Sequence, residues 1–246
     1  MILTVDIGNT TIALTGLDGG FNVLSSEKIP SDELFCEPLE RALGGFPGIE
    51  SAVLSSVVPE LTEPVCRAVE QIIGKKPRII NAVSYRGILN IAIPEPEKLG
   101  LDRIADSAWA AVKYLLPAIT VDLGTATTFN VIGEGGTFLG GMIAAGLQTS
   151  LNALSERAAQ LPRLALSPPE RLIGTNTAEC MLSGAVIGAA AMIDGIAARV
   201  EAELGKPVTL ILTGGGARLA EPFLLHPHTH EPYLLAKGLA LTAAHA

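Results

Sequence analysis

One sequence motif occurs in both halves of the chain, as Leu3-Thr-Val-Asp6-Ile-Gly8-Asn-Thr-Thr11 and as Ile119-Thr-Val-Asp122-Leu-Gly124-Thr-Ala-Thr-Thr128. Each is a short apolar run rich in β-branched residues that ends in Asp, Gly and hydroxyl side chains, which is typical of a strand followed by a turn. The second copy begins nearly half a chain length after the first. We therefore predict two similar domains, residues 1–117 and 118–246.

The composition excludes several classes of protein. A formal charge of −8 and a pI near 5.0 argue against a nucleic-acid-binding surface, which needs clustered Lys and Arg. Three widely spaced cysteines, Cys36, Cys66 and Cys180, are typical of reduced thiols in the cytoplasm rather than a disulfide framework. The N-terminus has no signal-peptide pattern, and the apolar run 181–193 is shorter than a membrane span. We predict a cytoplasmic protein without nucleic-acid or membrane partners. Its 48% hydrophobic residues suggest an oligomer interface.

The pattern of strands and helices predicts an α/β protein with mixed sheets flanked by helices. We expect irregular, extended chain over 86–99, and a solvated loop around His226, His228 and His230, with a metal site there as the weaker alternative. Predicted strands are 1–7, 11–17, 21–29, 51–57, 78–81, a strand that opens at 118 and leads into the second turn, 127–132, 137–139 and 208–212. Predicted helices are 31–43 with Ser31 as its cap, 59–73, one after Asp102, 147–160, 178–204 and 233–243.

The repeated turns suit phosphate chemistry. Glycine lets a backbone approach a phosphate closely, hydroxyls and N–H groups donate hydrogen bonds, and a carboxylate holds a cation. We predict that Asp6 organises Mg²⁺, directly or through water, while Gly8, Asn9 and Thr10 donate to the phosphates. Thr125 and Thr127 would do the same from the second turn. A third glycine-rich loop, 213–217, could lie against a base or ribose, although such a loop is as often a tight turn.

Phosphoryl transfer also needs a base for the attacking hydroxyl. Asp102 is the best candidate because it lies in sequence between the two turns and has Arg103 beside it. It also sits at or next to a predicted helix N-terminus, so a helix cap is the structural alternative for this residue.

These motifs, taken together, closely resemble the type III pantothenate kinase family of the acetate and sugar kinase, heat-shock-chaperone and actin superfamily. The resemblance covers essentially the whole chain. It rests on the two turns and on Ser55-Ser-Val-Val-Pro59, Gly100-Leu-Asp-Arg103, Gly140-Gly141, Ile173-Gly-Thr-Asn-Thr177 and Thr213-Gly-Gly215. It implies two ribonuclease-H-like (actin-like ATPase) domains and the ATP-dependent phosphorylation of pantothenate to 4'-phosphopantothenate, the first step of coenzyme A biosynthesis.

The resemblance also implies roles for individual residues. Asp102 would be the general base, and Asp122 would bind a monovalent cation such as K⁺ or NH₄⁺. The protein would form a homodimer, as members of the family do, with its site near the subunit interface. ATP would be bound by Asp6, Ile7, Gly8, Asn9, Thr10, Thr11 and Thr125, and pantothenate by Ile93, Gly100, Leu101, Asp102, Arg103 and Thr177.

Four positions depart from the family pattern. Ile93 and Glu95 stand where a Tyr and an Asn are common, and Ala145 and Asn130 stand where a Pro and an Asp are common. Ile93 would remove an aromatic or hydroxyl contact to the substrate, and Glu95 would bring negative charge toward an anionic ligand. Two alternatives stay open: a kinase for another small hydroxy acid, and a non-catalytic nucleotide-binding regulator on the same fold.

Overall fold

The computed structural model describes residues 1–31 and 35–244, which form two compact units. The first comprises Met1–Leu89, Glu95–Trp109 and Tyr233–Ala246, and the second comprises Asn90–Pro94 and Ala110–Pro232. The units follow the packing of the chain, so the C-terminal helix is grouped with the N-terminal sheet. The domain boundary at 117/118, inferred from the repeat, stays a prediction.

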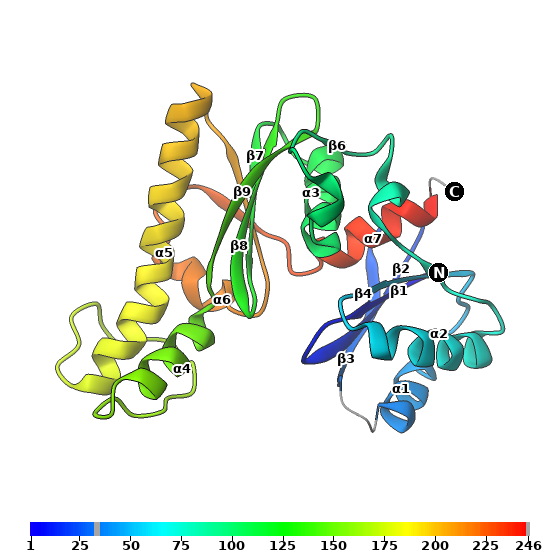
Figure 1. The fold of residues 1–246 in the computed structure, drawn as a ribbon, viewed down its shortest axis with the longest axis horizontal. Helices are drawn as coiled ribbons and strands as arrows, with labels where there is room; N and C mark the ends of the chain where they lie inside the picture. Colours follow the sequence, from blue (N-terminus) through cyan, green and yellow to red (C-terminus); the bar gives the residue numbers. More distant parts are fainter. Residues whose placement is uncertain (32–34, 245–246) are drawn as a thin grey trace. The chain divides into compact units, whose positions relative to one another are not determined.

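The first unit is built on a five-stranded sheet in the order β3-β2-β1-β4-β5 (Figure 1). The central strand β1 (Ile2–Ile7) pairs antiparallel with β2 (Thr11–Leu17), which pairs antiparallel with β3 (Val23–Pro30). On its other side β1 pairs parallel with β4 (Ser51–Ser56), and β4 pairs parallel with β5 (Arg78–Ile79).

The second unit is built on a six-stranded sheet in the order β6-β9-β8-β7-β10-β11, and the five strands after β6 repeat the order and pairing of the first sheet. The central β7 (Ala118–Leu123) pairs antiparallel with β8 (Ala126–Gly133), which pairs antiparallel with β9 (Thr137–Ala145). It also pairs parallel with β10 (Thr209–Thr213), and β10 pairs parallel with β11 (His228–His230). The predicted α/β fold with two mixed sheets is confirmed, and the repeated motif forms the central strand of each sheet.

Helices cover both faces of the first sheet (Figure 1). The helices α1 (Cys36–Leu43) and α2 (Pro59–Ile73) pack on one face, and α7 (Leu234–Ala244) contacts β1, β2 and β4 from the other. Proline at the first position begins α2, and Gly74 in the left-handed conformation ends it. The hydrophobic core between β1, β2, β4 and the first two helices includes Leu3, Val5, Ile7, Leu39, Leu54 and Val65.

The helices of the second unit include α4 (Leu147–Arg157), α5 (Thr177–Leu204) and the short α6 (Ala217–Ala220). The side chain of Asn176 caps α5 by accepting a hydrogen bond from Glu179 N at 3.0 Å, and Gly205 ends this helix. One face of α5 packs on the sheet through Val186, Ile193 and Ala197. By length and composition α5 could cross a membrane, a test that core helices of soluble proteins also pass.

The structure corrects several expectations for the first half of the chain. Ser31 does not cap a helix, because its hydroxyl donates to Gly8 O at 2.7 Å and α1 begins at Cys36; the predicted stretch 32–34 lies outside the described residues. The helix after Asp102 is α3 (Leu101–Lys113). The stretch 86–99, predicted to be irregular, contains the short strand β6 (Asn90–Ile91), which pairs with β9, and the 3-10 turn η2 (Pro96–Lys98). It follows the 3-10 turn η1 (Ala82–Tyr85).

The histidine segment is also not a solvated loop. His226 Nε2 lies 3.1 Å from Glu201, and His230 Nδ1 lies 3.2 Å from Glu221, the first residue of the turn η3 (Glu221–Phe223). These pairs and the strand β11 hold the segment against the rest of the second unit. No group of three or more His, Cys, Asp or Glu side chains among residues 1–31 and 35–244 is arranged to hold a metal ion, so the weaker metal alternative has no support.

Candidate active site

The first turn joins β1 to β2 and is held at several points. Gly8 N donates to Thr11 O at 2.9 Å, and Ser31 N donates to Thr10 O at 3.0 Å. The Ser31 hydroxyl also donates a hydrogen bond to Gly8 O. The residue that follows β3 therefore stabilises the turn through two hydrogen bonds. The N–H group of Gly8 is used within the turn, whereas Asn9 and Thr10 expose their side chains at its tip.

Asp6 lies at the end of β1, where the residue is partly buried. Burial raises the pKa of Asp6 from 3.8 to about 6, a hydrogen bond from Ser55 opposes this rise, and the nearby charge of Asp102 adds to it. Lys28 acts in the lowering direction. A partly desolvated carboxylate beside a second acid fits a hard cation, because a positive charge relieves both the desolvation and the repulsion.

Asp102 lies in the first turn of α3, as its sequence context predicted. Its carboxylate lies so close to Gly100 that a Cβ on that glycine would be 2.5 Å from Asp102 Oδ1. The next residue, Arg103, is half-buried, and this burial lowers the pKa of its guanidinium while Asp102 raises it. The first unit therefore brings together three predicted site residues: Asp6, Asp102 and Arg103.

The second unit brings Asp122 to the equivalent place at the end of β7, where it pairs with Thr213 of β10. Gly214 follows directly, with φ of +87°, and a Cβ there would lie 2.2 Å from Asp122 Oδ1. Gly216 N also donates to Leu123 O at 2.9 Å. Only glycine permits this approach, so the glycine-rich loop lies against the Asp122 carboxylate. The sequence did not indicate this contact.

The second turn rests on the first turn of α4. Thr125 O accepts hydrogen bonds from Gly146 N at 3.1 Å and from Thr149 Oγ1 at 2.7 Å, while the Thr125 side chain stays exposed. Thr127 is buried and its hydroxyl donates to Ala145 O at 3.4 Å, which does not support the predicted phosphate contact of Thr127. The turn therefore presents Thr125 beside a helix N-terminus, where anions are favoured.

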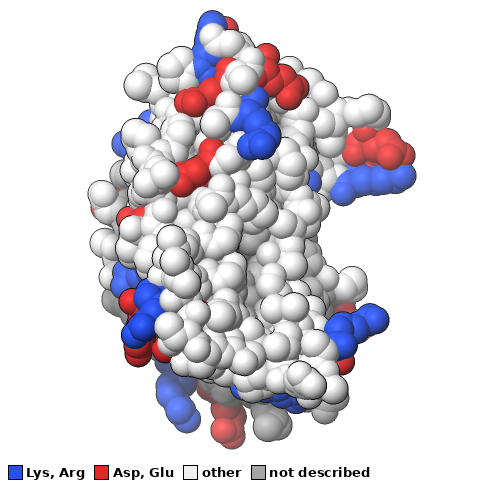
Figure 2. Space-filling model, turned by 90° about the vertical axis from the view of Figure 1, so that its left-hand side faces the viewer, with Lys and Arg blue, Asp and Glu red and all other residues white. Residues whose placement is uncertain are grey.

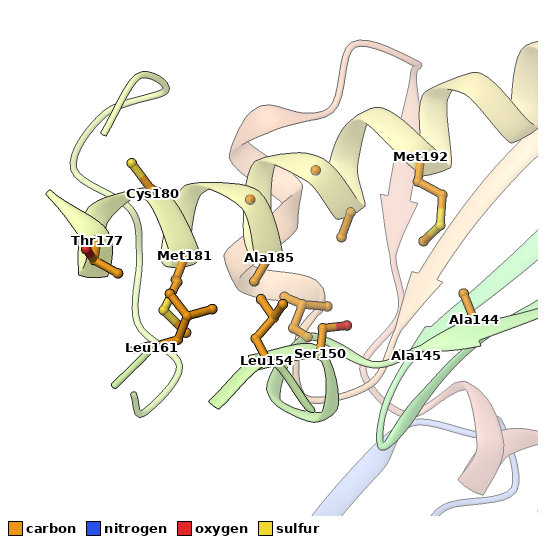
Figure 3. A pocket seen from close by; sticks show the side chains of 14 residues that line it. Ala144, Ala145, Ser150, Leu154, Leu161, Thr177, Cys180, Met181, Ala185 and Met192 are labelled. Carbon is orange, nitrogen blue, oxygen red and sulfur yellow. The ribbon is translucent and has the colours of Figure 1, made fainter. Parts of the chain in front are cut away.

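An apolar groove of about 480 Å³ runs beside α5 in the second unit (Figure 3). Thr177, the first residue of α5 and a predicted substrate contact, lies at one end of it, and Met192 lies at the other. Between them the lining consists mainly of small or apolar side chains, among them Ser150, Leu154 and Ala185.

Ile93 and Glu95, the two residues before Gly100 that depart from the family pattern, have different surroundings. Ile93 is partly buried in the segment after β6. The Glu95 carboxylate accepts a hydrogen bond from Lys98 Nζ at 2.5 Å, so its negative charge is balanced locally rather than left beside the substrate motif. Both members of this pair are exposed, and such pairs contribute little to stability.

Comparison with known proteins agrees with the sequence motifs. A sequence model of the family described as type III pantothenate kinase matches residues 2–199. Curated type III pantothenate kinases from Thermus thermophilus and Moorella thermoacetica are 38% and 36% identical to the chain. The alignments cover 97% of both chains for the first and 98% of both chains for the second. The chain belongs to the type III pantothenate kinase family.

Solved structures share the fold with this type III pantothenate kinase at much lower identity. A Baf family transcriptional activator from Campylobacter jejuni aligns with a TM-score of 0.61 and 21% identity, covering 99% of this chain and 98% of that one. An activator of 2-hydroxyisocaproyl-CoA dehydratase from Clostridium difficile, with bound ADPNP, aligns with a TM-score of 0.52 and 14% identity, covering 98% and 93%. At such identities these likenesses concern the fold alone.

Asp6 should make the stability of this type III pantothenate kinase depend on pH. Because the pKa of Asp6 is raised from 3.8 to about 6 on folding, its favourable contribution is complete below pH 3.8 and is lost as the pH rises through about 6. We expect Asp6→Asn to increase the free energy of unfolding of the metal- and nucleotide-free protein by about 1 to 3 kcal/mol at pH 8. The gain should shrink as the pH falls from 6 to 4, as measured by urea denaturation.

Asp18 is a control of opposite sign. Its exposed carboxylate accepts hydrogen bonds from the side chain of Asn22, from Asn22 N and from Gly20 N, and these bonds lower its pKa. Asp18→Asn should therefore lower stability at pH 8. A stability gain for Asp6→Asn that is the same at pH 4 and pH 8 would contradict the assignment.

Proposed function

We propose that the protein transfers the γ-phosphoryl group of ATP to the hydroxyl group of pantothenate, giving 4'-phosphopantothenate, the first step of coenzyme A biosynthesis. Membership of the type III pantothenate kinase family over nearly the whole chain is the observation that carries this proposal. The closeness of Asp6 and Asp102 within the first unit also supports the proposal. Phosphoryl transfer needs a cation site and a base near each other.

In this mechanism Asp102 accepts the proton of the pantothenate hydroxyl as its oxygen bonds to the γ-phosphorus and the bond to ADP breaks. Arg103 lies next to Asp102 on α3 and offers positive charge to the pantothenate carboxylate. Gly100 and Leu101, which lead into α3, would line the same substrate site, with Ile93 as a further contact. In the second unit Thr177 is the proposed pantothenate contact.

The first turn, Asp6 through Thr11, and Thr125 of the second turn are the proposed ATP contacts. Asn9, Thr10 and Thr125 have the exposed side chains that a phosphate needs. Mg²⁺ would balance the charge of the phosphates. Asp6 fits it as a direct or water-mediated ligand, in keeping with the usual sharing of Mg²⁺ between one or two carboxylates and substrate phosphates.

Asp102→Asn tests the proposed base. The substitution removes the proton acceptor but keeps the shape of the partly buried side chain, so kcat with ATP and pantothenate should fall by about 10² to 10⁴. Thermal unfolding should change little. Glu97→Gln, which neutralises an exposed acid shortly before the motif, is the matched control and should keep full activity. Turnover of Asp102→Asn within a few-fold of the parent would remove Asp102 from this role.

Asp122 is the proposed ligand of a monovalent cation, K⁺ or NH₄⁺. The approach of Gly214 to its carboxylate supports a compact site at this end of β7. We expect the rate in K⁺ or NH₄⁺ to exceed the rate in tetramethylammonium at equal ionic strength, and Asp122→Asn to abolish the difference. A cation-dependent rise in the melting temperature should disappear in the same variant. Equal rates of the parent enzyme in all three salts would refute cation activation.

We further propose a homodimer in which α5 and its groove face a second copy of this chain, with the site near this interface. Only 33% of the most apolar 18-residue window of α5 is buried within the chain. Large hydrophobic side chains nearby are also exposed, among them Ile143, Leu154, Leu172 and Ile173. Figure 2 looks at the side on which α5 lies in Figure 1, and a broad central band of that face carries no Lys, Arg, Asp or Glu. A second copy would cover this surface.

A cytoplasmic location, supported by three free cysteines, stays a prediction.

A charge in the groove tests the dimer. Gly188 lines the groove and has open space around it, so Gly188→Glu should fold as a monomer but place a charge in the proposed interface. We expect a dimer for the parent protein and a monomer for the variant, as measured by light scattering at micromolar concentration. Ala198→Glu, at an exposed position of the same helix outside the groove, should stay dimeric. A parent that is monomeric, or a Gly188→Glu variant that is still dimeric, would contradict this interface.

A further inference from the structure

Ser55 on β4 lies beside Asp6 in the first sheet. The two residues are direct partners in the parallel pairing of β1 and β4, so their side chains share one face of the sheet. Ser55 is buried, and its hydroxyl is hydrogen-bonded to the Asp6 carboxylate. An ionised carboxylate only accepts hydrogen bonds, so Ser55 is the donor.

We propose that Ser55 is a positioning residue that orients the Asp6 carboxylate for Mg²⁺ and nucleotide binding. This inference rests on the proposed function, in which Asp6 serves the metal and the phosphates. The need for such a donor follows from the surroundings of Asp6. Burial and the neighbouring Asp102 both disfavour the charged carboxylate, and the hydrogen bond from Ser55 acts against them. Without this bond the carboxylate would lose a fixed, buried contact that defines its direction.

The size of the effect can be estimated from other metal sites. Groups that hydrogen-bond to a metal ligand typically change metal affinity or activity by about 10 to 100-fold when they are removed. Ser55 touches neither the nucleotide nor pantothenate in this scheme. Its loss should therefore alter the dependence on Mg²⁺ and leave the KM for pantothenate unchanged.

Ser56 provides a matched control on the same strand. It follows Ser55, so its side chain points to the opposite face of β4. Its hydroxyl lies 3.1 Å from Val58 O and accepts a hydrogen bond from Thr62 Oγ1 at 2.7 Å, which ties the strand to the start of α2. Ser56→Ala removes a partly buried hydroxyl from the same strand without touching Asp6.

The experiment compares Ser55→Ala, Ser55→Cys, Ser55→Thr and Ser56→Ala in the full-length protein. Two quantities are measured for each variant. The first is the Mg²⁺ concentration that gives half-maximal activity. The second is the affinity for ADP, determined by calorimetry once with Mg²⁺ and once with EDTA. We expect Ser55→Ala to raise the half-maximal Mg²⁺ concentration about 10 to 100-fold and to weaken ADP binding only when Mg²⁺ is present. Ser55→Thr, which keeps the hydroxyl, should restore most of the loss, and Ser56→Ala should behave as the parent.

Ser55→Cys guards against a folding defect, because it keeps an unbranched side chain with one terminal atom and replaces the hydroxyl by a weak donor. A Mg²⁺ dependence in Ser55→Cys that equals that of the parent would overturn the inference, whether or not Ser55→Ala folds. Equal losses in Ser55→Ala and Ser56→Ala would overturn it too, since they would show a general effect on β4.

Asp6→Asn separates this inference from the proposed function. If Asp6→Asn raises the Mg²⁺ requirement and the Ser55 variants do not, the role of Ser55 is wrong and the proposed site stands. If Asp6→Asn itself leaves the Mg²⁺ dependence unchanged, the proposed role of Asp6 fails, and the inference about Ser55 fails with it.

Discussion

A carboxylate at the end of the central strand of each sheet is the constraint on which the rest of the structure depends. In both units that strand pairs antiparallel with the next strand on one side and parallel with a later strand on the other. The antiparallel partner creates the tight turn, and the parallel partner brings a second segment beside the acid. For Asp6 this segment contains Ser55, and for Asp122 it is followed by Gly214.

The two carboxylates have different surroundings despite this common plan. Asp6 lies near the acid Asp102 and accepts a hydrogen bond from a buried hydroxyl, which suits a divalent cation shared with phosphates. Asp122 instead lies directly against the backbone of a glycine-rich loop. Duplication of the fold therefore supplied two equivalent positions, and the neighbouring segments gave each position its own chemistry.

The apolar composition of the chain has two structural consequences. Most of it fills the two cores, where strands and helices bury Leu, Val and Ile. Part of the remainder lies on α5 and beside its groove, where the described chain leaves apolar residues uncovered. Small residues such as Gly184 and Gly188 on α5 leave room for close packing of another helix, which is the physical basis of the proposed subunit contact.

The sequence by itself determined the duplicated α/β fold, the strands and turns around Asp6 and Asp122, and the place of Asp102 in the first turn of a helix. These features follow from local patterns: β-branched apolar runs, Asp-x-Gly turns and helix periodicity. Residue pairs that are distant in sequence were decided only by the tertiary structure. Ser31 supports the first turn instead of capping a helix, because β3 returns beside that turn.

The contact of Ser55 with Asp6 depends on the register of two parallel strands, and the contact of Gly214 with Asp122 depends on a φ of +87°. Parallel strands are joined by a long crossover connection and not by a tight turn, so turn residues do not fix their register. For the same reason the sequence could name the acids of the site, whereas the hydroxyl and the glycine that hold them became visible only in the folded chain.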